Sequence, residues 1–172
     1  DAYLSSSWKT VLVGARGRGG STIFALDVSK PQSFDKENVL WEISAQNNGF
    51  SDLGAQLGKV KIGRLNNGKW AAIFGNGYQR DNPSVNPEGK SILYIVDLES
   101  GKLIKKIDTS QSSNNGLSEA TLLDTNNDLS IDYIYAGDLQ GNLWKFDISS
   151  ADIDDWQIAN RQASLKPSPL FK

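Results

Sequence analysis

Residues 122–148 read LLDTNNDLSIDYIYAGDLQGNLWKFDI and combine an acidic loop with two strand-like segments. Acidic and amide side chains occupy alternate positions at the start of this stretch. The remainder divides into two short apolar runs joined by a tight turn that contains glycine, and both runs are too short for ordinary helices. The stretch therefore predicts a β-hairpin directly preceded by a loop of oxygen-bearing side chains.

The same pattern of short apolar runs recurs along the chain. Three glycines, Gly14, Gly75 and Gly137, end one run in each copy, and Asp27, Asp97 and Asp147 close the run that follows. Because these runs are rich in β-branched and aromatic residues, we expect strands. The expected strands cover residues 9–14, 21–28 and 39–43, then 57–65, 70–75, 91–98 and 101–107, and finally 117–123, 132–137, 141–148 and 156–158.

A recurring four-strand unit of this kind is typical of a β-propeller blade. Propellers close with roughly four to eight blades, whereas this chain supplies about three. The sequence thus predicts an all-β fold, a partial β-propeller of about three four-stranded antiparallel blades from a larger propeller. The approximate blades are residues 1–45, 55–108 and 117–160, with 161–172 as the start of the next blade. The alternative is a twisted β-sandwich with long loops.

Little helix is expected. The best candidate is a single turn in residues 149–161, where Ser150 could act as the N-cap. The four runs of the second unit are interrupted by a polar insert, residues 76–90, which contains two prolines.

Composition excludes several classes of function. The 172 residues contain no Cys and no His, which rules out disulfides, thiolate metal sites and a Ser-His-Asp triad. The net charge of −2 gives no electrostatic footprint for nucleic acid. No apolar run is long enough to predict a transmembrane segment. The abrupt start of the chain and the absence of Met indicate a piece of a longer protein.

The acidic loop predicts a calcium site. Its side chains at alternate positions would point to one centre, and Ca²⁺ prefers such hard oxygen ligands. The predicted ligands are Asp124, Asn126, Asp128, the Ser130 carbonyl and Asp132. Strands flank the loop, so it is not an EF-hand, and a plain Asx-rich turn is the alternative. Leu129 occupies the position where such loops usually have Gly, which would lower the affinity or shift the turn to Asn127.

Other candidates carry weaker signals. Arg16 and Arg18 lie in a glycine-rich connector that lacks the ending of a P-loop, so a hairpin tip is expected there. The acidic cluster Asp152, Asp154 and Asp155 lacks ligand spacing. The tryptophans suit blade-packing anchors better than a ligand cage, and they are Trp8, Trp41, Trp70, Trp144 and Trp156.

Several stretches resemble one protein family. Residues 122–148, together with 8–28 (WKTVLVGARGRGGSTIFALDV), 69–78 (KWAAIFGNGY) and 93–101 (LYIVDLESG), are similar to the C-terminal β-propeller of the PilC/PilY-type type IV pilus biogenesis factors and tip adhesins. The resemblance implies that Ca²⁺ binds the five residues matching that family's loop. It also implies an exported, non-enzymatic protein at the bacterial surface, pilus tip or outer membrane that promotes pilus extension and adhesion. The implied partners are pilus components (minor pilins), host-cell or abiotic surfaces, and the remaining blades of the same propeller.

Two other identities remain open at this point. Integrin-like or lectin-like propellers also carry acidic loops, but they usually repeat them in successive blades. Quinone-dependent dehydrogenase propellers have strands similar to GNLWKFD, but no catalytic residues of that class can be placed here. The second unit crosses the same junction with Asn66-Asn67-Gly68. The scaffold therefore does not require acids at that junction, which favours an ion-binding role for them.

Overall fold

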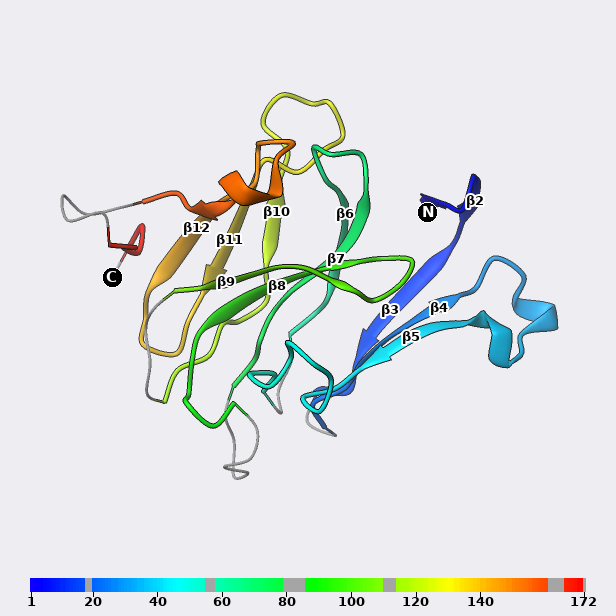
Figure 1. The fold of residues 1–172 in the computed structure, drawn as a ribbon, viewed down its shortest axis with the longest axis horizontal. Helices are drawn as coiled ribbons and strands as arrows, with labels where there is room; N and C mark the ends of the chain where they lie inside the picture. Colours follow the sequence, from blue (N-terminus) through cyan, green and yellow to red (C-terminus); the bar gives the residue numbers. More distant parts are fainter. Residues whose placement is uncertain (18–19, 55–57, 79–85, 110–113, 161–165, 172) are drawn as a thin grey trace.

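The computed structural model describes residues 1–17, 20–54, 58–78, 86–109, 114–160 and 166–171, and regular structure in these ranges consists of β-strands and single 3-10 turns (Figure 1). The strands are β1 (Ala2–Leu4), β2 (Ser7–Lys9), β3 (Val11–Ala15), β4 (Ile23–Asp27), β5 (Val39–Ile43), β6 (Lys61–Arg64), β7 (Trp70–Gly75), β8 (Ile92–Asp97), β9 (Leu103–Asp108), β10 (Thr121–Leu123), β11 (Tyr133–Gly137), β12 (Leu143–Asp147) and β13 (Gln157–Ile158). The expected all-β fold is confirmed.

Each sheet consists of strands that are consecutive in the chain and antiparallel. β6–β9 and β10–β13 form four-stranded sheets, whereas β3–β5 form a three-stranded sheet and β1–β2 a separate hairpin. The first unit has the three strands expected over residues 9–14, 21–28 and 39–43 rather than the four of a complete blade, and the described residues before β3 supply no counterpart of β6 and β10.

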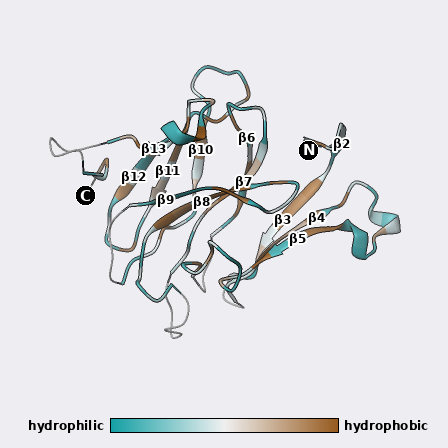
Figure 2. Ribbon diagram, viewed as in Figure 1, coloured by the Kyte–Doolittle hydropathy of each residue, from teal (hydrophilic) through white to brown (hydrophobic). Residues whose placement is uncertain are grey.

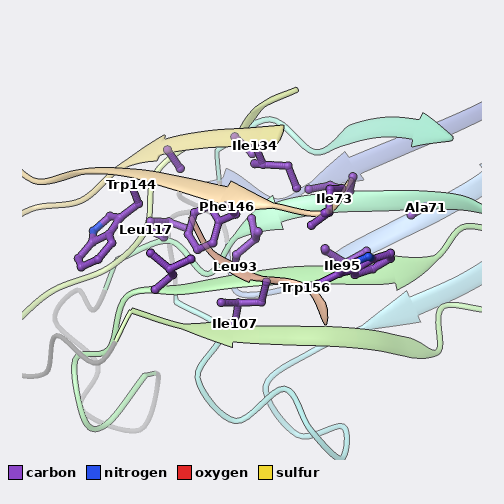
Figure 3. Close-up of a cluster of buried hydrophobic side chains, with 14 of the residues drawn as sticks. Ala71, Ile73, Leu93, Ile95, Ile107, Leu117, Ile134, Trp144, Phe146 and Trp156 are labelled. Atoms are coloured by element: carbon purple, nitrogen blue, oxygen red, sulfur yellow. The ribbon is translucent and has the colours of Figure 1, made fainter. Parts of the chain in front are cut away.

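The sheets pack against one another through alternating residues of their strands. Side chains point to opposite faces at successive positions of a strand, and Figure 2 shows that the most apolar segments lie in the strands. One core lies between the sheets of β3–β5 and β6–β9 and includes Ile23, Ala25, Phe74 and Tyr94. A second core lies between the sheets of β6–β9 and β10–β13 (Figure 3) and includes Ile73, Ile95, Ile134, Trp144 and Phe146. The middle sheet is thus buried on both faces.

Strand pairing corrects one detail of the predicted repeat. Ala15 pairs with Ile23 in the first sheet, as Gly75 pairs with Leu93 in the second. The counterpart of Gly75 is therefore Ala15, one residue after the predicted Gly14. Gly14 is small for a different reason, because a Cβ there would lie 2.5 Å from the ring of Phe24.

The closing aspartates play one structural role in all three units. Asp27 Oδ1 accepts hydrogen bonds from the amide (3.0 Å) and hydroxyl (2.6 Å) of Ser29. Asp97 bonds to Ser100 in the same way, and Asp147 to Ser149. These aspartates therefore cap the turns that follow β4, β8 and β12.

Both ends of the described chain add pairing that the sequence did not predict. The β1–β2 hairpin turns at Ser5 and Ser6, which have φ of 46° and 64°. Phe171 pairs with Leu143 of β12, which attaches the C-terminal segment to the sheet of β10–β13. The approximate blade boundaries, with 161–172 opening another blade, stay a prediction. β6 is also shorter than its predicted range, and Leu57 lies outside the described residues.

Three 3-10 turns lie wholly within the described residues, namely η2 (Pro31–Ser33), η3 (Lys36–Asn38) and η4 (Ile153–Asp155). η4 lies in the predicted segment, but Asp152 is its N-cap and accepts a hydrogen bond from the Asp154 amide (2.9 Å), so the assignment of that role to Ser150 was wrong. No helix of the described chain is long and apolar enough to cross a bilayer.

Candidate metal centre

The predicted ligand residues lie in a single loop, residues 124–132, that joins β10 to β11 (yellow in Figure 1). The loop projects beyond the ends of these strands (Figure 1), and its residues 125–129 are exposed. Ser130 and Asp132 are buried at its base. The loop thus has an exposed tip and an anchored limb.

Asp124 organises the tip through main-chain contacts. Its Oδ1 accepts from the amides of Asn126 (3.2 Å) and Asn127 (2.7 Å), and its Oδ2 accepts from the amide of Leu129 (2.9 Å). Asn127 and Leu129 both have positive φ, 62° and 68°. The expectation that a turn could shift to Asn127 was therefore incomplete, because Leu129 also adopts the left-handed conformation. This conformation is more costly for leucine than for asparagine, because a leucine side chain cannot form a local hydrogen bond.

Asn126 and Asp128 continue this pattern along the tip. The Asp128 amide donates to Asn126 Oδ1 (2.9 Å), and Asn126 Nδ2 donates to Asp128 Oδ2 (3.2 Å). The Ser130 amide in turn donates to Asp128 Oδ1 (2.7 Å). The side chains at alternate positions therefore accept hydrogen bonds from main-chain amides of the loop and hold it in a tight turn.

The buried limb is anchored to the neighbouring sheet. The Ile131 amide donates to the Arg64 carbonyl (2.9 Å), and Arg64 Nη1 donates to Ser130 Oγ (3.0 Å). Asn66 Nδ2 donates to the Ile131 carbonyl (2.9 Å) and to the Ile148 carbonyl (3.3 Å). Asn66 belongs to the β6–β7 turn, so that turn supports the base of the loop.

Asp132 closes the loop from its buried end. Its Oδ2 accepts hydrogen bonds from the hydroxyl and the amide of Thr125. The side-chain bond from Thr125, followed by the bond from the Thr125 amide, lowers the pKa of Asp132 against the opposing effect of burial. The carboxylate is therefore held ionised at the point where the chain enters β11.

The donor chemistry of the loop fits a hard cation, although its oxygens are turned toward the main chain. Across the described ranges, no three acidic side chains are grouped closely enough to hold a metal ion between them. An ionised carboxylate has about four lone-pair sites, so the N–H bonds that orient these side chains do not use up their capacity to coordinate. Three carboxylates, an amide oxygen and a carbonyl form the kind of oxygen set that Ca²⁺ takes. Arg64 offsets part of their negative charge at the buried limb.

Sequence reasoning missed a buried polar hub after β7. Asn76 is fully buried, and its Nδ2 donates to the carbonyls of Asp52 (2.8 Å) and Lys90 (2.9 Å). Its Oδ1 accepts from the amides of Ile92 (3.1 Å) and Leu117 (2.9 Å). One amide thus joins the segment before its own sheet to the segment that leads into the next sheet.

Asp138 occupies the equivalent position after β11. It accepts from Trp144 Nε1 (2.8 Å), Asn115 Nδ2 (3.0 Å), and both the amide and the side chain of Asn142. Burial raises the pKa of Asp138, but the hydrogen bonds from Asn142, Trp144 and Asn115 outweigh it and leave the pKa lowered. The available signal was positional, since each hub directly follows the glycine that ends the second strand.

The weaker sequence candidates find structural explanations or remain untested. Arg16 is exposed, while Arg18 lies outside the described residues. Asp152 caps η4, and Asp155 accepts from the Ser150 hydroxyl (2.7 Å). Within the insert, residues 79–85 lie outside the described ranges.

The expected packing role holds for some tryptophans and fails for one. Trp41, Trp144 and Trp156 are buried, and each indole N–H donates a hydrogen bond. Trp70 is half-buried against the first core. Trp8, in contrast, is 67% exposed, so its assignment as a packing anchor was wrong.

Comparison with known proteins establishes the family. The sequence profile of the PilY1 beta-propeller domain matches residues 1–168. The chain belongs to this family. It is 46% identical over 182 aligned positions to a type IV pilus biogenesis factor PilY1 homolog of Xylella fastidiosa (strain Temecula1), covering 99% of the chain and 12% of that protein. It is 45% identical to the type IV pilus biogenesis factor PilY1 of Pseudomonas aeruginosa (strain UCBPP-PA14), covering 86% of the chain and 12% of that protein.

The fold comparison agrees with the family. The crystal structure of the Pseudomonas aeruginosa PilY1 C-terminal domain superposes with a TM-score of 0.81 at 36% identity, covering 97% of this chain and 35% of that one. The partial β-propeller is therefore confirmed, in preference to the β-sandwich. The family match also favours this family over the integrin-like, lectin-like and dehydrogenase alternatives. The chain spans only about an eighth of the length of the curated relatives, which are described as pilus biogenesis factors.

Proposed function

We propose that this chain is a calcium-binding propeller segment of a type IV pilus-associated, non-enzymatic protein that promotes pilus extension and adhesion. The observation that carries the calcium assignment is the contrast between two equivalent connections. The β6–β7 junction is closed by Asn66-Asn67-Gly68, whereas the β10–β11 junction uses residues 124–132 with three carboxylates. The longer acidic loop is not needed to connect the strands, so a ligand accounts for its chemistry.

The ligand set would be Asp124, Asn126, Asp128, the Ser130 carbonyl and Asp132. A bound Ca²⁺ would neutralise the repulsion among the carboxylates at this one turn. The anchored limb fixes the end of the loop, because Ser130 bonds to Arg64 of the neighbouring sheet and Asp132 bonds to Thr125 across the loop. The exposed tip would contribute Asp124, Asn126 and Asp128. Because the anchored limb is already fixed, only the exposed tip would have to reorient when Ca²⁺ binds.

Calorimetry with Ca²⁺ tests the site on the intact protein. We expect one saturable binding event, with the affinity lowered at least about tenfold in Asp128→Ala and in Asp132→Ala. Asp154→Ala, in the acidic cluster beside η4, is the matched control and should bind normally. Equal heats in the wild-type protein and both loop variants would refute the ligand assignment.

The role at the pilus rests on the relatives, which carry the name of type IV pilus biogenesis factors. The proposed partners are pilus components such as minor pilins, host-cell or abiotic surfaces, and further blades of the same propeller. The proposed location is the cell surface, the pilus tip or the outer membrane. A strain whose full-length protein carries Asp128→Ala should show fewer extended pili and weaker surface attachment than one carrying Asp154→Ala. Equal piliation and attachment in the two strains would separate calcium binding from these functions.

A further inference from the structure

Two surface hollows lie at equivalent places, one beside the closing aspartate of the sheet β3–β5 and one beside that of the sheet β6–β9. The first has a volume of about 340 Å³ and is lined in part by Trp8, Lys9, Asp27, Ser29, Lys30 and Asn38. The second has a volume of about 470 Å³ and is lined in part by Lys69, Asp97, Ser100 and Lys102. Pairing confirms their equivalence, since the Val28 amide bonds to the Thr10 carbonyl as the Leu98 amide bonds to the Trp70 carbonyl. Lys9 therefore corresponds to Lys69, and Asp27 to Asp97.

The first hollow differs from the second by an exposed indole. Trp8 contacts Tyr3 and Trp70 at interplanar angles of 65° and 73°, so neither ring stacks parallel on it. The β1–β2 hairpin holds Trp8 in place, because Leu4 is buried in the core below it. A large aromatic side chain that is held in place and mostly exposed offers a flat apolar face to a ligand.

The polar groups beside the indole are also fixed in orientation. Asp27 Oδ2 lies 3.1 Å from Lys9 Nζ, while its Oδ1 accepts both hydrogen bonds from Ser29. Asn38 Oδ1 accepts from the Asp35 amide (2.8 Å), which orients its side chain. Lys30 has no ion-pair partner among the residues that the structure describes. The hollow thus presents two ammonium groups and one carboxylate, a net positive charge in a protein of net charge −2.

We infer that this hollow binds a saccharide whose pyranose ring carries a carboxylate group. The apolar C–H face of the ring would stack on Trp8, and its hydroxyl groups would hydrogen-bond to Asp27 and Asn38. The ring carboxylate would pair with Lys30. This site is separate from residues 124–132 and does not rest on calcium binding. It gives the proposed adhesion a chemical class of ligand.

The second hollow provides an internal control. It shares the lysine and the capped aspartate, but its remaining wall includes Leu103, Ile104 and Ile153 in place of an indole. An aliphatic wall offers no flat aromatic face for a sugar ring. We therefore expect saccharide affinity to depend on Trp8, and variants in the second hollow should leave that affinity unchanged.

Titration of the intact protein with two tetrasaccharides tests the inference. One consists of alternating glucuronic acid and N-acetylglucosamine, and the other is the neutral chitotetraose. We expect the acidic sugar to bind at least tenfold more tightly and to alter the fluorescence of the exposed Trp8. Trp8→Ala should weaken binding at least tenfold, with Trp8→Phe intermediate. Lys30→Ala, at an exposed position where folding is not at risk, should abolish the preference for the acidic sugar.

Lys102→Ala in the second hollow is the matched control and should bind as the wild type does. Absence of acidic-sugar binding at millimolar concentration, equal affinity for the neutral sugar, or an equal loss in Lys102→Ala would overturn the inference. Titrations are run in excess Ca²⁺ and repeated with Asp128→Ala. Saccharide affinity should survive that substitution, so failure of the calcium site and failure of the saccharide site are distinguishable.

Discussion

The sheets β6–β9 and β10–β13 share one topology but close the junction between their first two strands differently. In the first, the Leu65 amide bonds to the Lys69 carbonyl (2.8 Å) across a short turn. In the second, the Asp132 amide bonds to the Leu123 carbonyl (2.9 Å) after the long acidic loop. The same strand pairing is thus closed by either connection, so joining the two strands does not require the long acidic loop.

The two sheets also differ at the hub that follows the second strand. Asn76 both donates and accepts, so it links carbonyl and amide groups of three segments. Asp138 only accepts, and it gathers donors from Asn115, Asn142 and Trp144. An amide suits a junction of backbone segments, whereas a carboxylate suits a turn surrounded by N–H groups.

Removal of the amide hub should have the largest effect on stability. Asn76→Ala would remove the side-chain partner of the Asp52 carbonyl and of the amides of Ile92 and Leu117 in a fully buried site, while the Lys90 carbonyl would keep its bond from Asn86 Nδ2. We expect a loss of at least about 3 kcal/mol in the free energy of unfolding, since each unsatisfied buried group costs about 1–3 kcal/mol. Urea denaturation measures it.

Two further variants sharpen that result. Asn76→Asp should also destabilise strongly, because a carboxylate cannot donate to the two carbonyls and would be buried without a counter-charge. Asn47→Ala removes an exposed asparagine that bonds only locally to Ser44, and should cost less than about 1 kcal/mol. A similar loss for Asn76→Ala and Asn47→Ala would show that the hub is not a structural link.

Exchange of residues 124–131 for residues 64–69 should have the next largest effect, confined to calcium. The exchanged protein should fold, because the short turn closes the same junction in the neighbouring sheet. Wild-type protein should gain roughly 2.7 kcal/mol of stability at a hundredfold excess of Ca²⁺ over Kd. The exchanged protein should gain nothing, as measured by thermal unfolding with Ca²⁺ and with chelator. A retained calcium-dependent gain would place the ion elsewhere.

The charge of Asp138, the second hub, should make the free energy of unfolding depend on pH. The pKa of Asp138 is lowered below its ordinary value of 3.8, so its contribution is fully present above that value and is lost as pH falls through the lowered pKa. Asp138→Asn should destabilise by about 1–3 kcal/mol at neutral pH, because its N–H₂ would face donors. The difference from wild type should shrink between about pH 5 and pH 2 in urea titrations. A pH-independent difference would contradict this role.

Local patterns accounted for most strands, while the features that depend on distant contacts could not be read from sequence. Alternation and the closing aspartates predicted the units. The β1–β2 hairpin was missed because Ser5 and Ser6 adopt positive φ without the Gly or Asn that usually signals such a turn. Gly14 was aligned with Gly75 although the two relieve different contacts, the Phe24 ring and the Ser118 carbonyl.

The candidate site divides in the same way. Ligand spacing predicted the loop 124–132, because alternate oxygen-bearing residues are a local signal. The support from Arg64 and Asn66 could not be predicted, because these residues lie in another sheet and bond to Ser130 and to main-chain carbonyls. A sequence pattern of this kind shows which atoms are available, and only the packing of the sheets shows what holds them.

Removal of the Asn66 side chain should have the smallest effect on stability and on calcium affinity. Asn66→Ala removes the hydrogen bonds to the carbonyls of Ile131 and Ile148 while leaving the predicted ligands intact. We expect about 1 kcal/mol less stability and a calcium affinity lowered by less than about tenfold. Asn67→Ala, at the next position of the same turn, loses a local bond to the Lys69 amide and should leave the calcium affinity unchanged. Because the two substitutions remove the same side chain from adjacent positions, only a link between the two sheets predicts that calorimetry will tell them apart.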